Sequence, residues 1–427
     1  MASYDITGAF LNAAFGPDDE ATYIKISKDI SDLWVIQDPA AKEYLDNKGE
    51  LLLQLDKFIY GLKQSPLKFQ MHLNATLERL GYERMTHDEC IFIKHDGPDF
   101  SVISTHVDDI LQVSTKPALY DELYNGLIAQ YNNITAHPVA KSYLGMTIER
   151  SANLECIKLT QKGLAQLCID KYPRRSGDRN RYTTPADEDL FKVPSPDNSP
   201  LLSDKEKTEF LSLVMTLMYG ARLTRPDILL PVTYLSSRTH MATKRDMEYA
   251  IRIVRYLEFS SDVGIIINCK DLKIRVTCDA SFGVHADGKG HTGFIVTFGS
   301  TQSYVHARSG KQKSPSTSST DSEVIALCEA LKFCVWLRNL ISELRIAKLE
   351  QIEIQEDNKS AILMTTDKSA LGRSKHILIK IWYVRHHVQA GSLDVTYLST
   401  DKMTADVLTK PMQGAMYFIH AGTMLGM

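Results

Sequence analysis

The sequence lacks the cysteine patterns that would indicate disulfide bonds or bound zinc. It contains seven cysteines in 427 residues, an odd number, and no two of them form a Cys-x-x-Cys pair. This argues against a disulfide framework and a zinc knuckle, and it favours a reducing compartment. No apolar run approaches the ~18 residues that a membrane-spanning helix needs. The N-terminal residues also lack the basic-then-apolar order of a signal peptide.

An excess of charge of one sign is absent as well. The formal net charge is −3, with 44% hydrophobic and 24% charged residues, which is ordinary for a soluble globular protein. The composition gives no overall electrostatic case for nucleic-acid binding, so any basic binding surface has to be local. A length of 427 residues allows two or three domains, each with its own core.

Two adjacent carboxylates, Asp108 and Asp109, interrupt an alternating apolar pattern. Apolar residues precede them at positions 100, 102 and 103 and follow them at 110, 111 and 113, which predicts a hairpin of two strands. A turn explains the pair, because Asp side chains accept hydrogen bonds from nearby backbone N–H groups. The alternative is a Mg²⁺ site, in which hard oxygen ligands at the hairpin tip hold the ion against a phosphate. A third carboxylate elsewhere in the chain decides between them.

Asp5 is the first candidate for that third carboxylate, because it lies at the end of a probable strand. Polymerisation of nucleotides uses two divalent ions about 3.5–4 Å apart, and three carboxylates on neighbouring strand ends suit such a pair. Phe10 follows five positions later and could stack under the sugar of a nucleotide, although core packing is the simpler explanation. Gln64, close behind Gly61, offers a polar side chain beside a close backbone approach to a base pair.

Changes in composition divide the chain into segments. We expect a first domain at 1–150, a second at 151–271, a third at 272–415 and a C-terminal tail at 416–427. Within the second, residues near 183–203 are rich in Pro, Asp and Ser and predict a linker or long loop. In the third, the order strand–strand–strand–helix–strand–helix–helix–strand–helix is typical of a compact layered α/β domain, with its last helix starting near Lys402.

Four acidic residues of the third segment stand at strand ends and helix starts. Asp279 ends the first expected strand, Glu323 lies in the first turn of the long helix, Asp357 ends the fourth strand and Asp406 begins the last helix. Acidic residues at helix N-termini commonly do no more than interact with the helix dipole, which is the alternative for Glu323 and Asp406. In combination, the four predict a second two-metal site, suited to hydrolysing a phosphodiester.

Over nearly its whole length the sequence resembles the C-terminal Pol region of Ty1/copia-type long-terminal-repeat retrotransposons. In the reverse transcriptase part, the similar motifs lie at 5–12, 60–66, 107–109, 143–145, 224–228 and 253–257. In the ribonuclease H part, they lie at 278–280, 318–323, 357–361, 373–377 and 405–410. The motifs follow the order of the family, and their combination is highly specific.

The resemblance implies an α+β and α/β multidomain fold. It predicts a reverse transcriptase palm at 1–150, a thumb and connection at 151–271 and a ribonuclease H-like domain with a mixed five-stranded sheet at 272–415. The implied activities are those of an RNA-directed DNA polymerase (a nucleotidyltransferase) and a ribonuclease H (an endonuclease). The implied partners are an RNA template, a DNA primer, an RNA–DNA hybrid and dNTPs, without a membrane. The implied location is a cytoplasmic virus-like particle or the nucleus.

The resemblance also implies roles for individual residues. The polymerase metals would be held by Asp5, Asp108 and Asp109, and the hydrolytic metals by Asp279, Glu323, Asp357 and Asp406. Each site would take two Mg²⁺ ions, with Mn²⁺ as a substitute. Phe10 would exclude a ribose 2′-hydroxyl, and Gln64 would lie near the templating base pair. Arg373, Lys375 and His376 would contact the nucleic-acid backbone, with a solvated basic turn as the alternative.

The sequence departs from the family pattern in its first part. The fingers region that precedes Asp5 in the family is not present, and His106 replaces the usual aromatic residue. We therefore expect hydrolysis to be retained better than polymerisation. The alternative is a truncated, polymerase-inactive remnant that retains only ribonuclease H activity or nucleic-acid binding. A metal hydrolase of small substrates would need a cluster of His or Cys ligands, which the sequence does not indicate.

Overall fold

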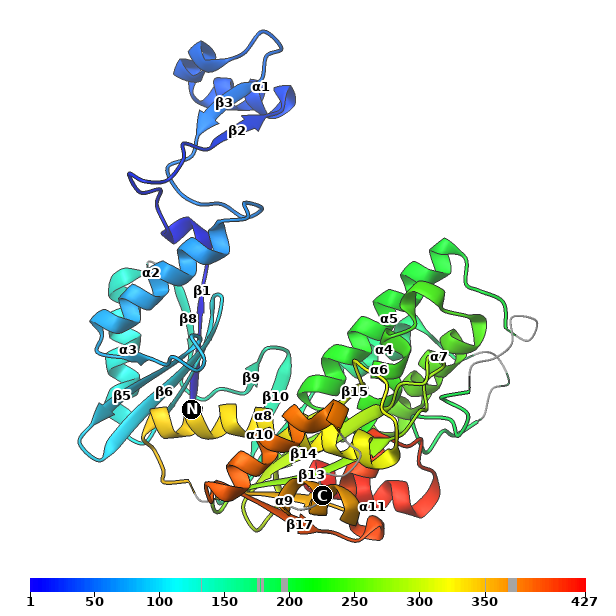
Figure 1. Ribbon diagram of the computed structural model, residues 1–427. Helices are drawn as coiled ribbons and strands as arrows, with labels where there is room; N and C mark the ends of the chain where they lie inside the picture. The colour runs from blue at the N-terminus through cyan, green and yellow to red at the C-terminus, as the bar shows by residue number, and fades with distance from the viewer. Residues whose placement is uncertain (132, 175–176, 178–179, 193–198, 350, 368–374) are drawn as a thin grey trace. The chain divides into compact units, whose positions relative to one another are not determined.

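The computed structural model describes residues 1–131, 133–174, 177, 180–192, 199–349, 351–367 and 375–427. The chain forms two compact units, Met1–Ala140 and Lys141–Met427 (Figure 1), and each is considered by itself. In the described ranges, no helix combines the length and the apolar character that crossing a bilayer requires.

The first unit is built on a six-stranded antiparallel sheet. In spatial order its strands are β4 (Glu83–Arg84), β5 (Ile91–Asp96), β6 (Asp99–His106), β7 (Asp109–Ser114), β1 (Ala2–Ile6) and β8 (Ile134–His137). Helices α2 (Ser65–Arg79) and α3 (Pro117–Gln130) share one hydrophobic core with alternate residues of the strands, among them Tyr4 and Ile6 of β1. Because successive strand residues point to opposite faces, Asp5 lies on the face of β1 away from these helices.

Residues between β1 and α2 form a small substructure that the sequence analysis left without helices or complete strands. It contains β2 (Tyr23–Ile26), α1 (Lys28–Gln37), a 3₁₀ turn η2 (Pro39–Tyr44) and β3 (Leu51–Gln54). Ser31 is the one buried residue of α1, and its hydroxyl accepts a hydrogen bond from Leu51 N at 3.0 Å. Leu33 and Trp34 are exposed. Helix α1 therefore buries a serine while these large apolar side chains stay exposed. The spacing of its apolar residues does not predict which side of the helix is buried.

The first part of the second unit is a four-stranded sheet packed with four helices. The strands are β12 (Ile265–Ile267), β11 (Ile157–Thr160), β10 (Met146–Arg150) and β9 (Ser142–Tyr143); the helices are α4 (Lys162–Lys171), α5 (Asp204–Leu223), α6 (Leu229–Ser236) and α7 (Lys244–Phe259). Strands β9 and β10 lie within the first domain expected from the sequence, 1–150, but they pair with strands of the second unit.

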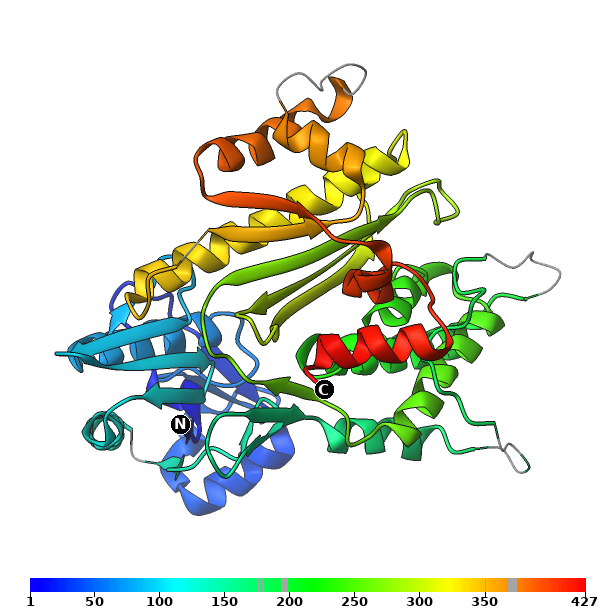
Figure 2. The same ribbon diagram turned by 90° about the horizontal axis from the view of Figure 1, so that it is seen from below.

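The second sheet of this unit is the mixed five-stranded sheet that the sequence analysis predicted. Its order is β15 (Ser303–Lys311), β14 (His291–Phe298), β13 (Ile274–Ser281), β16 (Ile352–Glu356) and β17 (Leu393–Tyr397). Strands β13 to β15 are antiparallel, whereas β16 and β17 run parallel to β13. Helix α8 (Ser319–Leu344), with α9 (Lys359–Thr366) and α10 (Leu378–Gln389), packs on the sheet, and α11 (Gly414–Leu425) lies on its other side (Figure 2).

The C-terminal region differs from the expected last helix near Lys402. Two short 3₁₀ segments, η6 (Thr400–Lys402) and η7 (Thr404–Leu408), occupy that stretch instead. Pro411 disfavours helical backbone at Lys410, so a helix that began near Lys402 would have to end before Lys410. The expected tail, 416–427, forms most of α11, in which Tyr417 is buried and its hydroxyl donates to Tyr256 Oη at 3.1 Å. The tail thus belongs to the hydrophobic core that also contains residues of α7.

Candidate active sites

The three carboxylates of the first unit lie at the same end of its sheet. Asp5 of β1 and Asp109 of β7 are register partners in neighbouring antiparallel strands. Asp108 lies in the two-residue loop between the paired residues His106 and Asp109. Its carbonyl oxygen accepts a hydrogen bond from Ile6 N at 3.2 Å. Paired strands therefore bring together residues that are more than a hundred positions apart in sequence.

The loop between β6 and β7 carries backbone strain. Val107 has a φ of 57°, a conformation that a β-branched side chain rarely adopts and that costs of order 1–3 kcal/mol. The hydrogen bond from Ile6 N to the Asp108 carbonyl and the β6–β7 pairing hold this conformation. Two-residue hairpin loops commonly require positive φ at this position, where Gly, Asn or Asp is usual, so the strain comes from the β-branched Val107 itself. Strain that is retained at such a tip is consistent with a functional role.

The electrostatics of these carboxylates favour a bound cation. Burial raises the pKa of Asp109, and the neighbouring charges of Asp108 and Asp5 raise it further. Across the described parts of the chain, none of the three carboxylates takes part in an ion pair. A divalent cation bound by carboxylate oxygens would remove this repulsion.

The two other candidates of the first unit lie near the start of α2. Phe10 is half-buried on a 3₁₀ turn, η1 (Ala9–Asn12), and its ring centroid lies 4.7 Å from that of Tyr60 and 6.2 Å from that of Phe69. Gln64 is the exposed residue immediately before α2. Gly61, with a φ of 101°, makes the turn between Tyr60 and Gln64. Phe10 thus packs on the core while part of its ring remains accessible.

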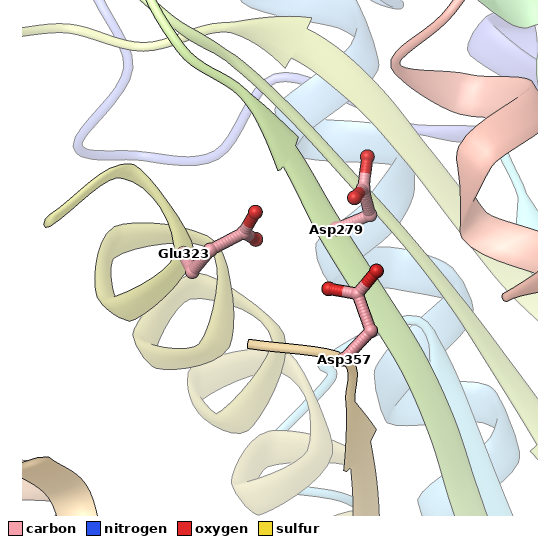
Figure 3. A group of neighbouring side chains, drawn as sticks. All are labelled: Asp279, Glu323 and Asp357. Carbon is pink, nitrogen blue, oxygen red and sulfur yellow. The ribbon is translucent and has the colours of Figure 1, made fainter. Parts of the chain in front are cut away.

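Three of the four acidic residues predicted in the second unit converge in a compact cluster. Asp279 lies near the end of β13, Asp357 directly follows β16, and Glu323 lies on α8 (Figure 3). One carboxylate oxygen from each lies within 4.8 Å of the others. Strands β13 and β16 are parallel, so their carboxyl ends share an edge. Helix α8 begins beside it after its N-cap Ser318, whose hydroxyl accepts from Asp321 N at 3.1 Å.

The chemistry of this cluster fits a divalent metal ion. Glu323 is buried, and among the described residues its Oε2 atom has no hydrogen-bond partner. Burial raises the pKa of Glu323 well above its usual range, and the nearby charges of Glu356 and Asp279 add to this effect. Such an arrangement is costly unless a cation compensates the charge. Hard oxygen donors of this kind suit Mg²⁺.

Asp406, the fourth predicted acid, joins the site through a lysine. Lys410 Nζ lies 2.7 Å from Asp406 Oδ1 and 3.2 Å from Asp279 Oδ1. Burial raises the pKa of Asp406 to about 7, and the charge of Asp279 contributes. The other oxygen of Asp279, Oδ2, accepts a short hydrogen bond from the Thr409 hydroxyl. Sequence reasoning had placed Lys410 only within a family motif and had given it no role.

Glu356 is a further acid beside the cluster that sequence reasoning missed. Its side chain is buried, Oε1 accepts from Asn358 N at 3.0 Å, and Oε2 lies 3.3 Å from Cys278 Sγ. Burial raises its pKa to about 8, so the group is mostly neutral at pH 7. The sequence offered one signal for Glu356, its position directly before Asp357 at the end of a strand. Because successive strand residues point to opposite faces, that position did not predict that both side chains lie beside the same cluster.

The basic residues predicted to contact nucleic acid are only partly described. Arg373 lies outside the described residues, and Lys375 begins a 3₁₀ turn, η5 (Lys375–Ile377). His376 is exposed, and its Nε2 lies 3.0 Å from Asp321 Oδ2 at the start of α8. That contact attaches the turn to the helix that carries Glu323.

The six-stranded sheet and the mixed five-stranded sheet are consistent with a reverse transcriptase-like fold followed by a ribonuclease H-like fold. Residues 4–186 match the family model described as reverse transcriptase (RNA-dependent DNA polymerase). The foamy viral protease-reverse transcriptase in complex with RNA/DNA hybrid has a similar fold, with a TM-score of 0.51 and 12% identity over 93% of this chain and 44% of that one. At this identity the likeness concerns the fold alone.

The chain is also similar to Pol proteins of retrotransposons. The chain is 27% identical over 365 residues to the Pol polyprotein of transposon TNT 1-94 from Nicotiana tabacum, which covers 85% of this chain and 27% of the relative. It is 29% identical to that of transposon RE1 from Arabidopsis thaliana (89% and 25% covered). It is 28% identical to the putative Ty5-1 protein YCL074W of Saccharomyces cerevisiae (69% and 88% covered). These similarities support the resemblance to copia-type retrotransposon Pol proteins that the motifs predicted. It spans about a quarter of the length of the first two relatives.

Proposed function

We propose that the second unit hydrolyses the RNA strand of an RNA–DNA hybrid in a reaction that depends on Mg²⁺. The observation that carries this proposal is the cluster of Asp279, Glu323 and Asp357, whose carboxylate oxygens lie within 4.8 Å of one another. The unpartnered, buried Oε2 atom of Glu323 supports it. Bound Mg²⁺ would polarise the scissile phosphodiester and lower the pKa of the attacking water.

In this proposal the protein contributes a rigid and desolvated set of ligands. Asp279 and Asp357 are held by paired strands, and Glu323 by a helix of 26 residues. Asp406 supplies a further carboxylate through its position next to Asp279. His376 attaches its turn to α8 through Asp321 and thereby limits movement of the helix start. Such preorganisation is what a site needs in order to stabilise charge that develops during the reaction.

We propose polymerisation of DNA on an RNA template as a second activity, located in the first unit. The supporting observations are the register pairing of Asp5 with Asp109 and the strained tip that carries Asp108. Phe10 would lie below the sugar of the incoming dNTP and exclude a 2′-hydroxyl, and Gln64 would lie near the templating base pair. The RNA template and DNA primer would be held mainly through their phosphates. The expected site of action is a cytoplasmic virus-like particle or the nucleus.

Cleavage of a labelled hybrid tests the first activity. The purified chain is incubated with end-labelled RNA annealed to DNA, with Mg²⁺ or Mn²⁺ and without metal. We expect metal-dependent cleavage that Asp279→Asn reduces by at least about a hundredfold, because the variant loses a negatively charged ligand. Asp394→Asn is the matched control, since Asp394 is exposed on β17 of the same sheet. Cleavage that persists in Asp279→Asn would refute the proposal.

Primer extension on an RNA template tests the second activity separately. Synthesis that Asp109→Asn abolishes would support the polymerase proposal, and the hydrolysis assay of the same variant should remain unchanged. Hydrolysis without any extension would instead favour the polymerase-inactive alternative.

A further inference from the structure

Lys410 is a cation built into the proposed hydrolytic site. Its ammonium group lies 3.2 Å from Asp279 Oδ1 and 2.7 Å from Asp406 Oδ1, and so bridges two carboxylates from different elements. The Asp279 and Asp406 side chains are only 2% and 7% exposed, whereas that of Lys410 is 41% exposed. The charged head thus reaches a buried carboxylate pair from the solvent side.

The position of Lys410 restricts how Asp279 and Asp406 can bind a divalent cation. Asp279 Oδ2 is occupied by the Thr409 hydroxyl, so Oδ1 is the oxygen that Asp279 shares with Asp406 through Lys410. A divalent cation held jointly by Asp279 Oδ1 and Asp406 Oδ1 would have to occupy the space of the ammonium group. A second cation there would also be repelled by the lysine charge. The cluster of Asp279, Glu323 and Asp357 is less obstructed, because among the described residues Lys410 forms an ion pair with Asp279 alone of these three carboxylates.

We propose that Lys410 is a tethered competitor for the second divalent cation of this site. The first ion binds at Asp279, Glu323 and Asp357, and a second ion binds between Asp279 and Asp406 only when the Lys410 side chain moves out. The long, flexible and partly exposed stem of lysine allows that movement. Without the second ion, the ammonium group compensates the charge of Asp406. This inference rests on the proposed function of the second unit, and it gives Lys410 a role in the order and affinity of metal binding.

Manganese binding to the full chain tests the proposal without measuring activity. Free Mn²⁺ is quantified by electron paramagnetic resonance during a titration, and binding to this site is defined as the part that Asp279→Asn removes. We expect the wild type to bind one ion tightly and a second weakly. In Lys410→Met the second ion should bind up to about fivefold more tightly, the factor for losing one partly exposed charge contact. Lys410→Arg, which keeps the charge, should bind the second ion as weakly as the wild type.

Lys402→Met is the matched control, because Lys402 is an exposed lysine eight positions earlier. Equal affinities for the second ion in the wild type and Lys410→Met would overturn the inference while leaving the proposed function intact. If the wild type shows no binding that Asp279→Asn removes, the proposed function itself fails.

A second measurement uses the native lysine and does not depend on a neutral variant folding. Lysines of the wild type are dimethylated with ¹³C, and the Lys410 resonance is identified by its loss in Lys410→Arg. We expect this resonance to shift when the second equivalent of Mg²⁺ binds, and not when the first does. A resonance that is unmoved at saturating Mg²⁺ would show that the ammonium group never leaves, and would refute the proposal.

Discussion

Replacing Glu356 by glutamine should stabilise the second unit, and more strongly at higher pH. Burial raises the pKa of Glu356 from 4.5 to about 8, so the folded state retains a proton that the unfolded state releases over this interval. Stability therefore falls as pH rises from about 4.5 towards about 8. At 1.36 kcal/mol per pKa unit, the cost is about 1 kcal/mol at pH 5 and about 3 kcal/mol at pH 7. Glutamine is neutral at both values and removes this cost.

The local contacts allow the exchange. Glutamine keeps the carbonyl oxygen that accepts from Asn358 N, and its amide group can donate to Cys278 Sγ. The free energy of unfolding is measured by urea denaturation at pH 5, 6, 7 and 8 without divalent ions. Trp336 and Trp382 report on the second unit by fluorescence in a Trp34→Phe background, because Trp34 is the one tryptophan of the first unit.

The diagnostic quantity is the pH dependence of the difference between Glu356→Gln and the wild type. A gain in unfolding free energy that grows by about 2 kcal/mol between pH 5 and 7 is expected. Glu353→Gln serves as the control, because ion pairs with Lys273 and Arg275 lower the pKa of Glu353, and the same change there should destabilise. A pH-independent difference for Glu356→Gln would show that Glu356 is ionised in the folded state and would refute the reasoning.

Two further substitutions probe the scaffold around the sites. Asp227→Asn should lower the free energy of unfolding by about 3–5 kcal/mol, because Arg225, which donates to Asp227 at 2.9 and 2.7 Å, would remain buried without its carboxylate. Asp262→Asn, which breaks an exposed ion pair with Lys162, should leave the free energy of unfolding nearly unchanged in the same urea titration. Val107→Gly should raise the stability of the first unit by about 1 kcal/mol through relief of the positive φ. A lower thermal midpoint for that variant would contradict the strain assigned to the hairpin tip.

Local patterns in the sequence were sufficient for many of the elements. Helix α5, for example, starts with a capping box formed by Ser203 and Glu206, a start signal that lies within four residues of sequence. The layered α/β order and the positions of Asp279 and Asp357 at strand ends followed from alternation and from the order of elements, whereas the mixed five-stranded sheet was implied by the family resemblance. The hairpin with Asp108 and Asp109 was likewise a local feature. Short-range spacing carries this information because helix and strand periods repeat within a few residues.

The tertiary structure decided which groups share a site. Asp406 and Lys410 reach Asp279 only because η7 packs beside β13, and that path depends on contacts across more than a hundred residues. The same packing brings Glu356 into a buried environment that raises its pKa, and it converts the expected tail at 416–427 into a core helix. The sequence by itself therefore indicated the class of protein and the acidic residues proposed as ligands. Only the folded chain decided that a lysine lies between two of them, because burial and charge neighbours arise from long-range packing.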